Sequence, residues 1–361
     1  MIRRRSRWLA AAVVPLAVGA GALTWTVQAS AAQDLPAKSA EEVLSMALGS
    51  DVKTFSGALE QSSELGLPEL PDTGPAADVG VATALDLFTG THTARVFVDG
   101  PDKARLQVMD RLAERDVIRQ GRSVWFYSSR DNTAAHLSLP ERTGPGAGSP
   151  EEFGQPDAVQ TPDQLARRLL SAVDSSTQVT VGPETEVADR AAYELVLDPR
   201  SSATLVDSVT IAVDAQTGMP LSVQVQARNQ QKPAFTLAFT ELQLQTPSAE
   251  LFTFTPPPGA SVQERTLQAP AREGKAPGAV PSQQDSGYTV AGEGWDAVVA
   301  LPAGSVPADV AGSELLRQAT YAVPNGRAMT TALVSVLLTN DGRVFAGSVP
   351  LERLQAAAEA R

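Results

Sequence analysis

Apolar and polar residues alternate most regularly between Arg190 and Phe254. Four successive segments carry the alternation, and short turns separate them: Ala191–Leu197, Leu205–Val213, Leu221–Ala227 and Ala234–Leu244. Because successive side chains of a strand point to opposite faces, the pattern predicts an antiparallel meander with one apolar face. The phase shifts by one residue after Phe239, which predicts a bulge where the sheet curls. Such a meander forms either a packed sandwich or an open barrel around a cavity.

The half of the chain before this meander shows the same strand pattern in shorter segments. We expect strands at Thr54–Ser62, Val81–Phe88, Thr93–Asp99, Lys103–Met109, Asp116–Gln120, Ser123–Ser128 and Ala134–Leu139. The arginines of Asp110–Arg119 also have the i, i+4 spacing of a helix, but a strand is favoured there. Loops rich in proline are expected at Gly66–Gly80 and Pro140–Pro162.

Two helices are predicted by their start signals. Ser39 is followed by Glu42 three residues later, and Thr161 by Gln164, so each pair forms a capping box. The first helix ends at Gly49, and the second has Pro162 at its first position. Both helices carry one apolar stripe, which predicts that they cover part of the apolar face of the sheet.

The two ends of the chain differ from this central region. Residues 1–31 join a basic start, an apolar run and the small residues Ala29 and Ala31, as in a cleaved export signal. An uncleaved membrane anchor is the alternative, because the apolar run is about 20 residues long. Residues 265–287 are a linker rich in Pro, Gly and Ala. Residues 288–361 form a small α+β domain. Strands are expected at Trp295–Leu301, Met329–Thr339 and Val344–Val349, and helices at Ser313–Ala319 and Pro350–Ala360.

Composition excludes several classes of function. The formal charge is −12, and removal of the four arginines in residues 1–31 takes it to about −16, so nucleic-acid binding is not expected. The chain has no cysteine, which excludes disulfides, thiolate metal sites and cysteine nucleophiles. We expect an exported protein that acts as a monomer.

Catalytic motifs are absent from the sequence. It contains no nucleophile elbow, zinc-binding HExxH, phosphate loop or dinucleotide fingerprint. A serine–histidine–carboxylate site would have to use His92 or His136, and ordinary surface histidines are favoured instead. Asp110, Glu114 and Asp116 alternate with arginines, which is typical of a solvated charged face. We therefore expect no enzyme activity, no metal and no cofactor.

Five stretches carry a resemblance to a known family. They are LPAKSAEEVLSMAL at Leu35–Leu48, GTHTARVFVDGPDKARLQV at Gly90–Val108, RAAYELVLDPR at Arg190–Arg200, IAVDAQTGMPLSVQV at Ile211–Val225 and MTTALVSVLLTNDGRVFAGSV at Met329–Val349. With the order of the predicted elements, they resemble LolA-type lipoprotein carriers, the related domain of RseB-type envelope-stress regulators and, most closely, exported LolA-like proteins of actinobacteria. The resemblance implies an α+β fold: a half-open antiparallel β-barrel over residues 32–264, capped by helices, with the small domain after the linker.

The resemblance also implies a function and a set of residues. An apolar cavity would take acyl chains or lipoproteins, so the protein would be a carrier or sensor; alternatively, the small domain would bind a membrane partner such as an anti-sigma factor. The candidate cavity residues are Val96, Val98, Leu106, Val108, Trp125, Tyr127, Tyr193, Leu195, Val209, Ile211, Val223, Val225, Phe235 and Phe239. Arg95, Arg105 and Arg119 are the candidates for the arginine that latches the helical lid.

Overall fold

A computed structural model describes residues 35–66, 90–109, 113–139, 161–266, 287–306 and 314–360. The predicted export segment, the strand Val81–Phe88 and most of both proline-rich loops and of the linker lie outside these ranges. No helix among the described residues has the length and apolarity needed to cross a membrane.

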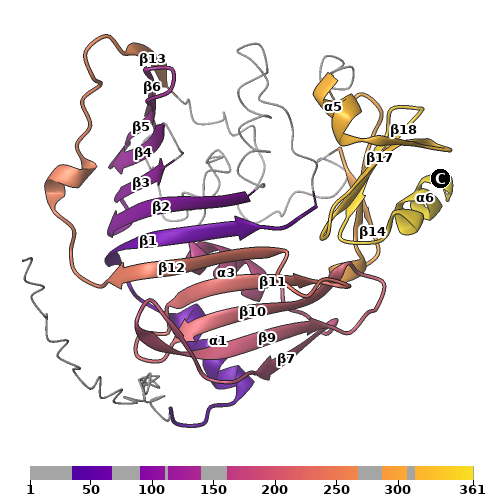
Figure 1. The fold of residues 1–361 in the computed structure, drawn as a ribbon, viewed down its shortest axis with the longest axis horizontal. Helices are drawn as coiled ribbons and strands as arrows, with labels where there is room; N and C mark the ends of the chain where they lie inside the picture. The colour runs from indigo at the N-terminus through magenta and orange to yellow at the C-terminus, as the bar shows by residue number, and fades with distance from the viewer. Residues whose placement is uncertain are drawn as a thin grey trace, which may run out of the picture. The chain divides into compact units, whose positions relative to one another are not determined.

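The described residues build one large sheet of thirteen strands (Figure 1). The strands are β1 (Thr54–Ser63), β2 (Gly90–Asp99), β3 (Lys103–Met109), β4 (Glu114–Gln120), β5 (Ser123–Ser128), β6 (Thr133–Ser138), β7 (Thr177–Val181), β8 (Thr185–Val187), β9 (Arg190–Pro199), β10 (Val206–Asp214), β11 (Pro220–Ala227), β12 (Phe235–Gln243) and β13 (Ser261–Thr266). Their order is β13-β6-β5-β4-β3-β2-β1-β12-β11-β10-β9-β7, with β8 paired to β9. Within the described residues β13 and β7 are the two edges, so the sheet is open.

The predicted meander is confirmed as β9–β12, and so is its bulge. Leu59 of β1 pairs with Phe239, whereas the preceding Ala58 pairs with Glu241. One residue of β12 is therefore left without a partner on β1, as a one-residue shift in the alternation requires. Gly57 lies beside the bulge, where an added Cβ would come 2.5 Å from the Glu241 carbonyl oxygen. The strand at Glu114–Gln120 is also confirmed, against the helical alternative.

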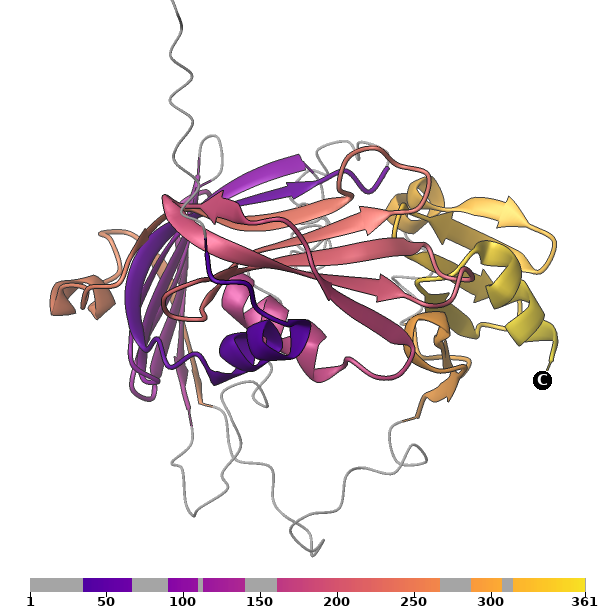
Figure 2. The ribbon, with the colours of Figure 1, turned by 90° about the horizontal axis from the view of Figure 1, so that it is seen from below.

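Two helices lie on the concave face of this sheet, which arches over them (Figure 2). They are α1 (Ala40–Gly49) and α3 (Pro162–Ser171), and both predicted capping boxes are present. The apolar stripes of the two helices pack on β9–β11. The buried residues of this core are Val43, Ala47, Ala166, Leu170, Tyr193, Leu195, Leu197, Val206, Val209, Ile211, Val213 and Val223. The half-open, helix-capped architecture predicted from the sequence is therefore confirmed.

The described residues after the linker form a second sheet of six strands. Its order is β14-β15-β19-β18-β17-β16, from strands β14 (Thr289–Ala291), β15 (Val298–Leu301), β16 (Tyr321–Val323), β17 (Gly326–Thr330), β18 (Ser335–Thr339) and β19 (Val344–Gly347). The short helix α5 (Glu314–Ala319) precedes β16, and α6 (Leu351–Glu359) closes the chain. Leu354 of α6 packs with Leu337 and Phe345 on one face of this sheet.

The strand region predicted at Met329–Thr339 is divided between two strands, β17 and β18, because Thr331 and Val334 close a turn between them. Trp295, which was predicted to begin a strand, lies instead in the 3-10 helix η3 (Gly294–Asp296) before β15. Its indole N–H donates to the Thr177 hydroxyl at 2.9 Å, and its ring packs against the core below α1 and α3.

Gly218 lies in the turn between β10 and β11, where this turn touches α1. It gives a direct test of this packing. Its φ is +72°, and an added Cβ would collide with the Met46 carbonyl oxygen of α1. Gly121 has a similar φ of +61° but nothing within 4 Å of its Cβ position. We expect Gly121→Ala to lower the free energy of unfolding by about 1 kcal/mol, the usual cost of left-handed backbone. Gly218→Ala should lower it by about 3 kcal/mol, since the collision adds to that cost.

Denaturant titration of both variants measures the difference. Equal losses for the two glycines would show that α1 does not press on this turn.

Candidate functional site

The strand registers decide which side chains of β2–β6 face the helices' side of the sheet. Residues that pair across a ladder share a face. Phe239 pairs with Leu59, Leu59 with Ala94, and Ala94 with Val108, so the concave face continues from the meander into β3. The next row of the same face runs through Val96, Leu106, Val117, Phe126 and Ala135.

The two helices are too small to cover this whole face. Each has ten residues, so each is about 15 Å long. Packed side by side they span about 20 Å, which equals about four strands at the usual spacing of about 4.8 Å. The contacts come close to this estimate, because α1 touches β7, β9 and β10 and α3 touches β11 and β12, which is five strands. Strands β2–β6 make no comparable contact with either helix.

The candidate cavity residues consequently divide into groups. Those under the helices are packed core: Tyr193, Leu195, Val209, Ile211 and Val223 are all buried. Val225 is half-buried against the same core, and Phe235 is half-buried opposite it. The Tyr193 hydroxyl also donates to the Pro36 carbonyl oxygen at 2.8 Å, which ties the approach to α1 to the sheet.

The concave face of β2–β6 carries both buried and half-buried apolar side chains. Val96 and Val108 are buried in one cluster with Phe239, and Val124 of β5 is also buried. Five other apolar side chains, on five neighbouring strands, are only half-buried. We call them the apolar wall: Val98 (β2), Leu106 (β3), Val117 (β4), Phe126 (β5) and Leu137 (β6). Val98 and Leu106 are among the cavity candidates predicted from the sequence, whereas the other three are not.

Trp125 and Tyr127 lie on the opposite, convex face. Trp125 pairs with Ile118 and Tyr127 with Asp116, whereas Phe126 between them pairs with Val117. The convex face is covered by the chain after β12, where Phe254 packs on Trp125 and Tyr127 with ring centroids 5.3 Å and 5.5 Å apart. Both alternating rows of β5 are apolar, so the sequence pattern did not decide which row faces inward.

The three candidate latch arginines are also separated by the registers. Arg95 is exposed on the convex face. Arg105 lies on that face too, where it forms an ion pair of 2.9 Å with the buried Asp116 and donates to the Leu251 carbonyl oxygen. Arg119 lies on the concave face, at the end of β4, and donates to the Gly121 carbonyl oxygen at 3.2 Å. Of these three residues, only Arg119 shares a face with α1 and α3.

The arginine that ties the two helices together is Arg167 of α3, which sequence analysis did not single out. It donates to the carbonyl oxygens of Leu48 at 3.0 Å and Ser50 at 2.8 Å, at the end of α1. Carbonyls in the last turn of a helix lack intrahelical partners and carry partial negative charge, so a guanidinium satisfies both needs. Asp163, one turn earlier, accepts from Nε of Arg167 at 2.9 Å and holds the side chain in place.

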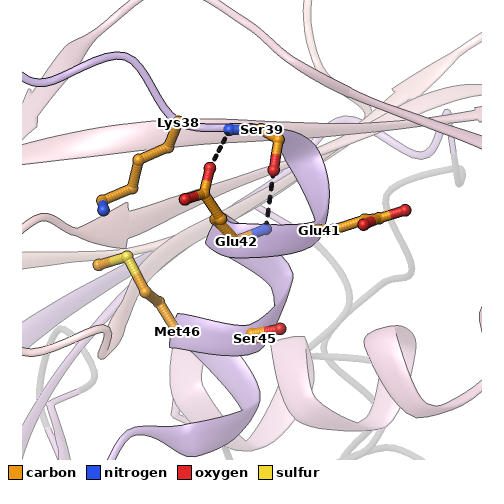
Figure 3. Close-up of a pocket in the computed structure, with 6 residues that line it drawn as sticks. All are labelled: Lys38, Ser39, Glu41, Glu42, Ser45 and Met46. Atoms are coloured by element: carbon orange, nitrogen blue, oxygen red, sulfur yellow. Dashed lines mark hydrogen bonds between the residues drawn. The ribbon is translucent and has the colours of Figure 1, made fainter.

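A hollow of about 570 Å³ lies beside α1 (Figure 3). Its lining residues are Lys38, Ser39, Glu41, Glu42, Ser45 and Met46. Figure 3 shows Glu42 folded back onto Ser39 in the capping box, with the Lys38 ammonium group and the Met46 side chain on the same side. The hollow is formed by one helix and its approach, and it carries two carboxylates, so it differs in chemistry from the apolar wall. The described residues contain no group of three His, Asp or Glu placed to hold a metal.

No family model and no curated protein matches the chain. Among solved structures it is similar to a chain of the Pseudomonas aeruginosa MucA/MucB complex, at 16% identity and a TM-score of 0.43, covering 88% of this chain and 96% of that one.

Two further solved structures are similar over a smaller part. An uncharacterized conserved protein from Thermus thermophilus has 13% identity and a TM-score of 0.34, with 63% of this chain and 99% of that one covered. A LolA superfamily protein from Nitrosomonas europaea has 11% identity and a TM-score of 0.25, with 60% of this chain and 99% of that one covered.

We expect Arg167→Ala to loosen α1 from α3. It leaves the carbonyls of Leu48 and Ser50 without their charged donor, which should lower the free energy of unfolding by about 1–2 kcal/mol. Arg168→Ala is the matched control, because Arg168 is the adjacent arginine and is exposed. Hydrogen exchange at the end of α1 should accelerate in the first variant only. Equal exchange in both variants would contradict the role of Arg167.

Glu42 gives a pH test of the cap on α1. The bond from the Ser39 N–H, at 2.7 Å, and then the Ser39 hydroxyl lower the pKa of the Glu42 carboxyl. A lowered pKa in the folded state means that the carboxylate stabilises the fold above its unfolded pKa, and that this stabilisation is lost as the pH falls through the folded pKa. Glu42→Gln keeps a cap acceptor but does not titrate.

We therefore expect wild type to be more stable than Glu42→Gln at pH 7 and this difference to shrink as the pH falls through the lowered pKa of Glu42. Denaturant titrations over a series of acidic pH values measure this. A stability difference that does not change with pH would contradict it.

Proposed function

We propose that the protein binds acyl chains, free or carried by a lipoprotein, outside the cytoplasmic membrane, and acts as a carrier or sensor. The observation that supports this is the apolar wall on the concave face. Its five side chains are half-buried and lie on strands with which α1 and α3 make no extensive contact. An elongated apolar ligand laid across β2–β6 would remove this remaining surface from water.

The chemistry of the wall suits an acyl chain in particular. Val98, Leu106, Val117 and Leu137 are aliphatic, and Phe126 adds one aromatic ring. Neighbouring strands lie about 4.8 Å apart, so the five strands of the wall match the length of an extended chain of about fifteen carbons. Burial of about eight methylenes would contribute about 6 kcal/mol, from which the cost of ordering the chain is subtracted. This range of affinity allows both binding and release, as a carrier requires.

Charge supports a protein that exchanges its ligand rather than staying on a membrane. The charge of about −16 without residues 1–31 would oppose adsorption to anionic lipid surfaces. The basic and apolar start of the chain supports export of the domains that follow it. We accordingly propose that the protein is located in the cell envelope or is secreted, and that it acts as a monomer.

A second candidate function is the regulation of a membrane protein through the small domain. It is favoured by the face of the second sheet that α6 does not cover. Met329 pairs with Val336, and Val336 and Val299 both pair with Ala346, so these four apolar residues share that face. Val299 is 36% exposed.

Cross-linking in the native host tests this second candidate. A photo-cross-linker at Val299 should capture an integral membrane protein, while one at the exposed Glu352 of α6 should not. Absence of such a product would remove this candidate.

Phe126→Ala tests the primary proposal. The ring should bury on ligand binding, so its loss should weaken palmitate binding about tenfold or more. The control is Met109→Ala, which removes a 41% exposed apolar side chain from the convex face. Native mass spectrometry and the shift in melting temperature with palmitate or a palmitoylated peptide measure binding.

Wild type that binds neither ligand would contradict the proposal. Equal weakening by Phe126→Ala and Met109→Ala would show that the ligand does not lie on the wall.

A further inference from the structure

Three polar side chains form a hydrogen-bonded chain on the convex face of the sheet. The Ser123 hydroxyl oxygen lies 2.8 Å from Nε2 of His136. The other ring nitrogen, Nδ1, lies 2.7 Å from Oε2 of Glu264. A hydroxyl, an imidazole and a carboxylate joined in this order through opposite ring nitrogens are the arrangement that activates a serine as a nucleophile.

The strand pairing creates this arrangement. His136 on β6 pairs with Trp125 on one side and with Glu264 of β13 on the other. Ser123 lies two residues before Trp125, so it shares the same face. The pairing of β13 with β6 is parallel, and it places Glu264 beside a histidine 128 positions earlier in the chain. No local sequence motif marks such a contact.

The imidazole is held in place by packing as well as by hydrogen bonds. The Trp125 ring stacks on it at a centroid distance of 4.3 Å and an interplanar angle of 12°. The side chains of His136 and Glu264 are 22% and 67% exposed, so the site opens to solvent. Because the carboxylate accepts a hydrogen bond from Nδ1–H, the tautomer with a lone pair on Nε2 is favoured, and this atom can accept the Ser123 proton.

We propose that Ser123, His136 and Glu264 form an acyl-transfer site that hydrolyses esters. The Ser123 oxygen attacks the ester carbonyl while Nε2 of His136 takes the hydroxyl proton. The bond to the leaving alcohol then breaks, and the imidazolium returns the proton to that alcohol. Water, deprotonated by the same nitrogen, attacks the acyl-serine and releases the acid and the free hydroxyl. This activity departs from the expectation, drawn from the sequence, that the chain is not an enzyme.

The surroundings indicate the class of substrate and the rate. Trp125, Phe254 and the 43% exposed Val262 provide an apolar surface next to the three groups, which suits an ester with an apolar acyl part. Water can solvate the developing oxyanion on this open face, and a site that relies on water in place of fixed donors typically loses a factor of about 10²–10³ in rate. We therefore expect slow hydrolysis of activated esters. The site lies on the opposite face from the apolar wall. A result that disproves ester hydrolysis here would therefore leave the proposed acyl binding untouched, and the reverse also holds.

The experiment combines covalent labelling with a variant series of the full chain. A fluorophosphonate probe should add one label, located at Ser123 by peptide mass spectrometry, and p-nitrophenyl butyrate should be hydrolysed. Ser123→Ala should lose both signals, and His136→Ala and Glu264→Gln should slow labelling at least tenfold. Ser138→Ala and His92→Ala, which alter the serine paired with Ser123 and the other histidine, should react as wild type does. Labelling that is absent in wild type, or unchanged in His136→Ala, would overturn the proposal.

A second variant measures the activation directly. The chain has no cysteine, so Ser123→Cys carries the sole thiol. A histidine within hydrogen-bond distance raises the thiolate fraction, so iodoacetamide should alkylate Ser123→Cys at least tenfold faster than Ser138→Cys. The added change His136→Ala should remove that advantage. Equal alkylation rates in the two cysteine variants, both folded by circular dichroism, would show that His136 does not activate position 123.

Discussion

The structure depends on one geometric constraint: two short helices cannot cover the open sheet of thirteen strands that the described residues build. Ten-residue helices packed side by side shield about four strands. The strands that they shield, β9–β11 and their neighbours, have a concave face that is mostly buried. Over β2–β6 the apolar wall on the same face remains half-buried. A globular domain normally buries its apolar sheet faces against its own elements, so a wall beyond the helices suits a ligand.

Specific contacts keep the helices over the meander. Gly218 lets its turn approach the Met46 carbonyl, Arg167 ties the end of α1 to α3, and the Tyr193 hydroxyl fixes Pro36 before α1. The convex face is organised differently. There the chain after β12 packs through Phe252 and Phe254, and the buried Asp116 holds Arg105 against Leu251. The two faces of β3–β6 therefore offer different chemistry. One face carries the apolar wall, and the other carries the hydrogen-bonded chain of Ser123, His136 and Glu264 with its aromatic neighbours.

Sequence alone predicted the features that depend on local pattern. The meander, the bulge after Phe239 and both capping boxes follow from alternation and from side chains within a few residues of one another. Where alternation is ambiguous, as in β5, the sequence did not decide which side chains face the helices, because Val124 and Phe126 are as apolar as Trp125 and Tyr127. Contacts between distant segments left no sequence signal. Arg167 meets α1 across 119 positions, and Glu264 meets His136 only because the short polar strand β13 pairs in parallel with β6.

Photoaffinity labelling with a diazirine-bearing fatty acid tests the role of the concave face most directly. The probe, bound to the full chain and activated by light, should cross-link to residues on β2–β6 that face the helices, with Leu106, Val117 and Phe126 among them. An excess of palmitate should suppress these cross-links. Cross-links confined to the convex face, or cross-links that palmitate does not suppress, would contradict an acyl-binding wall.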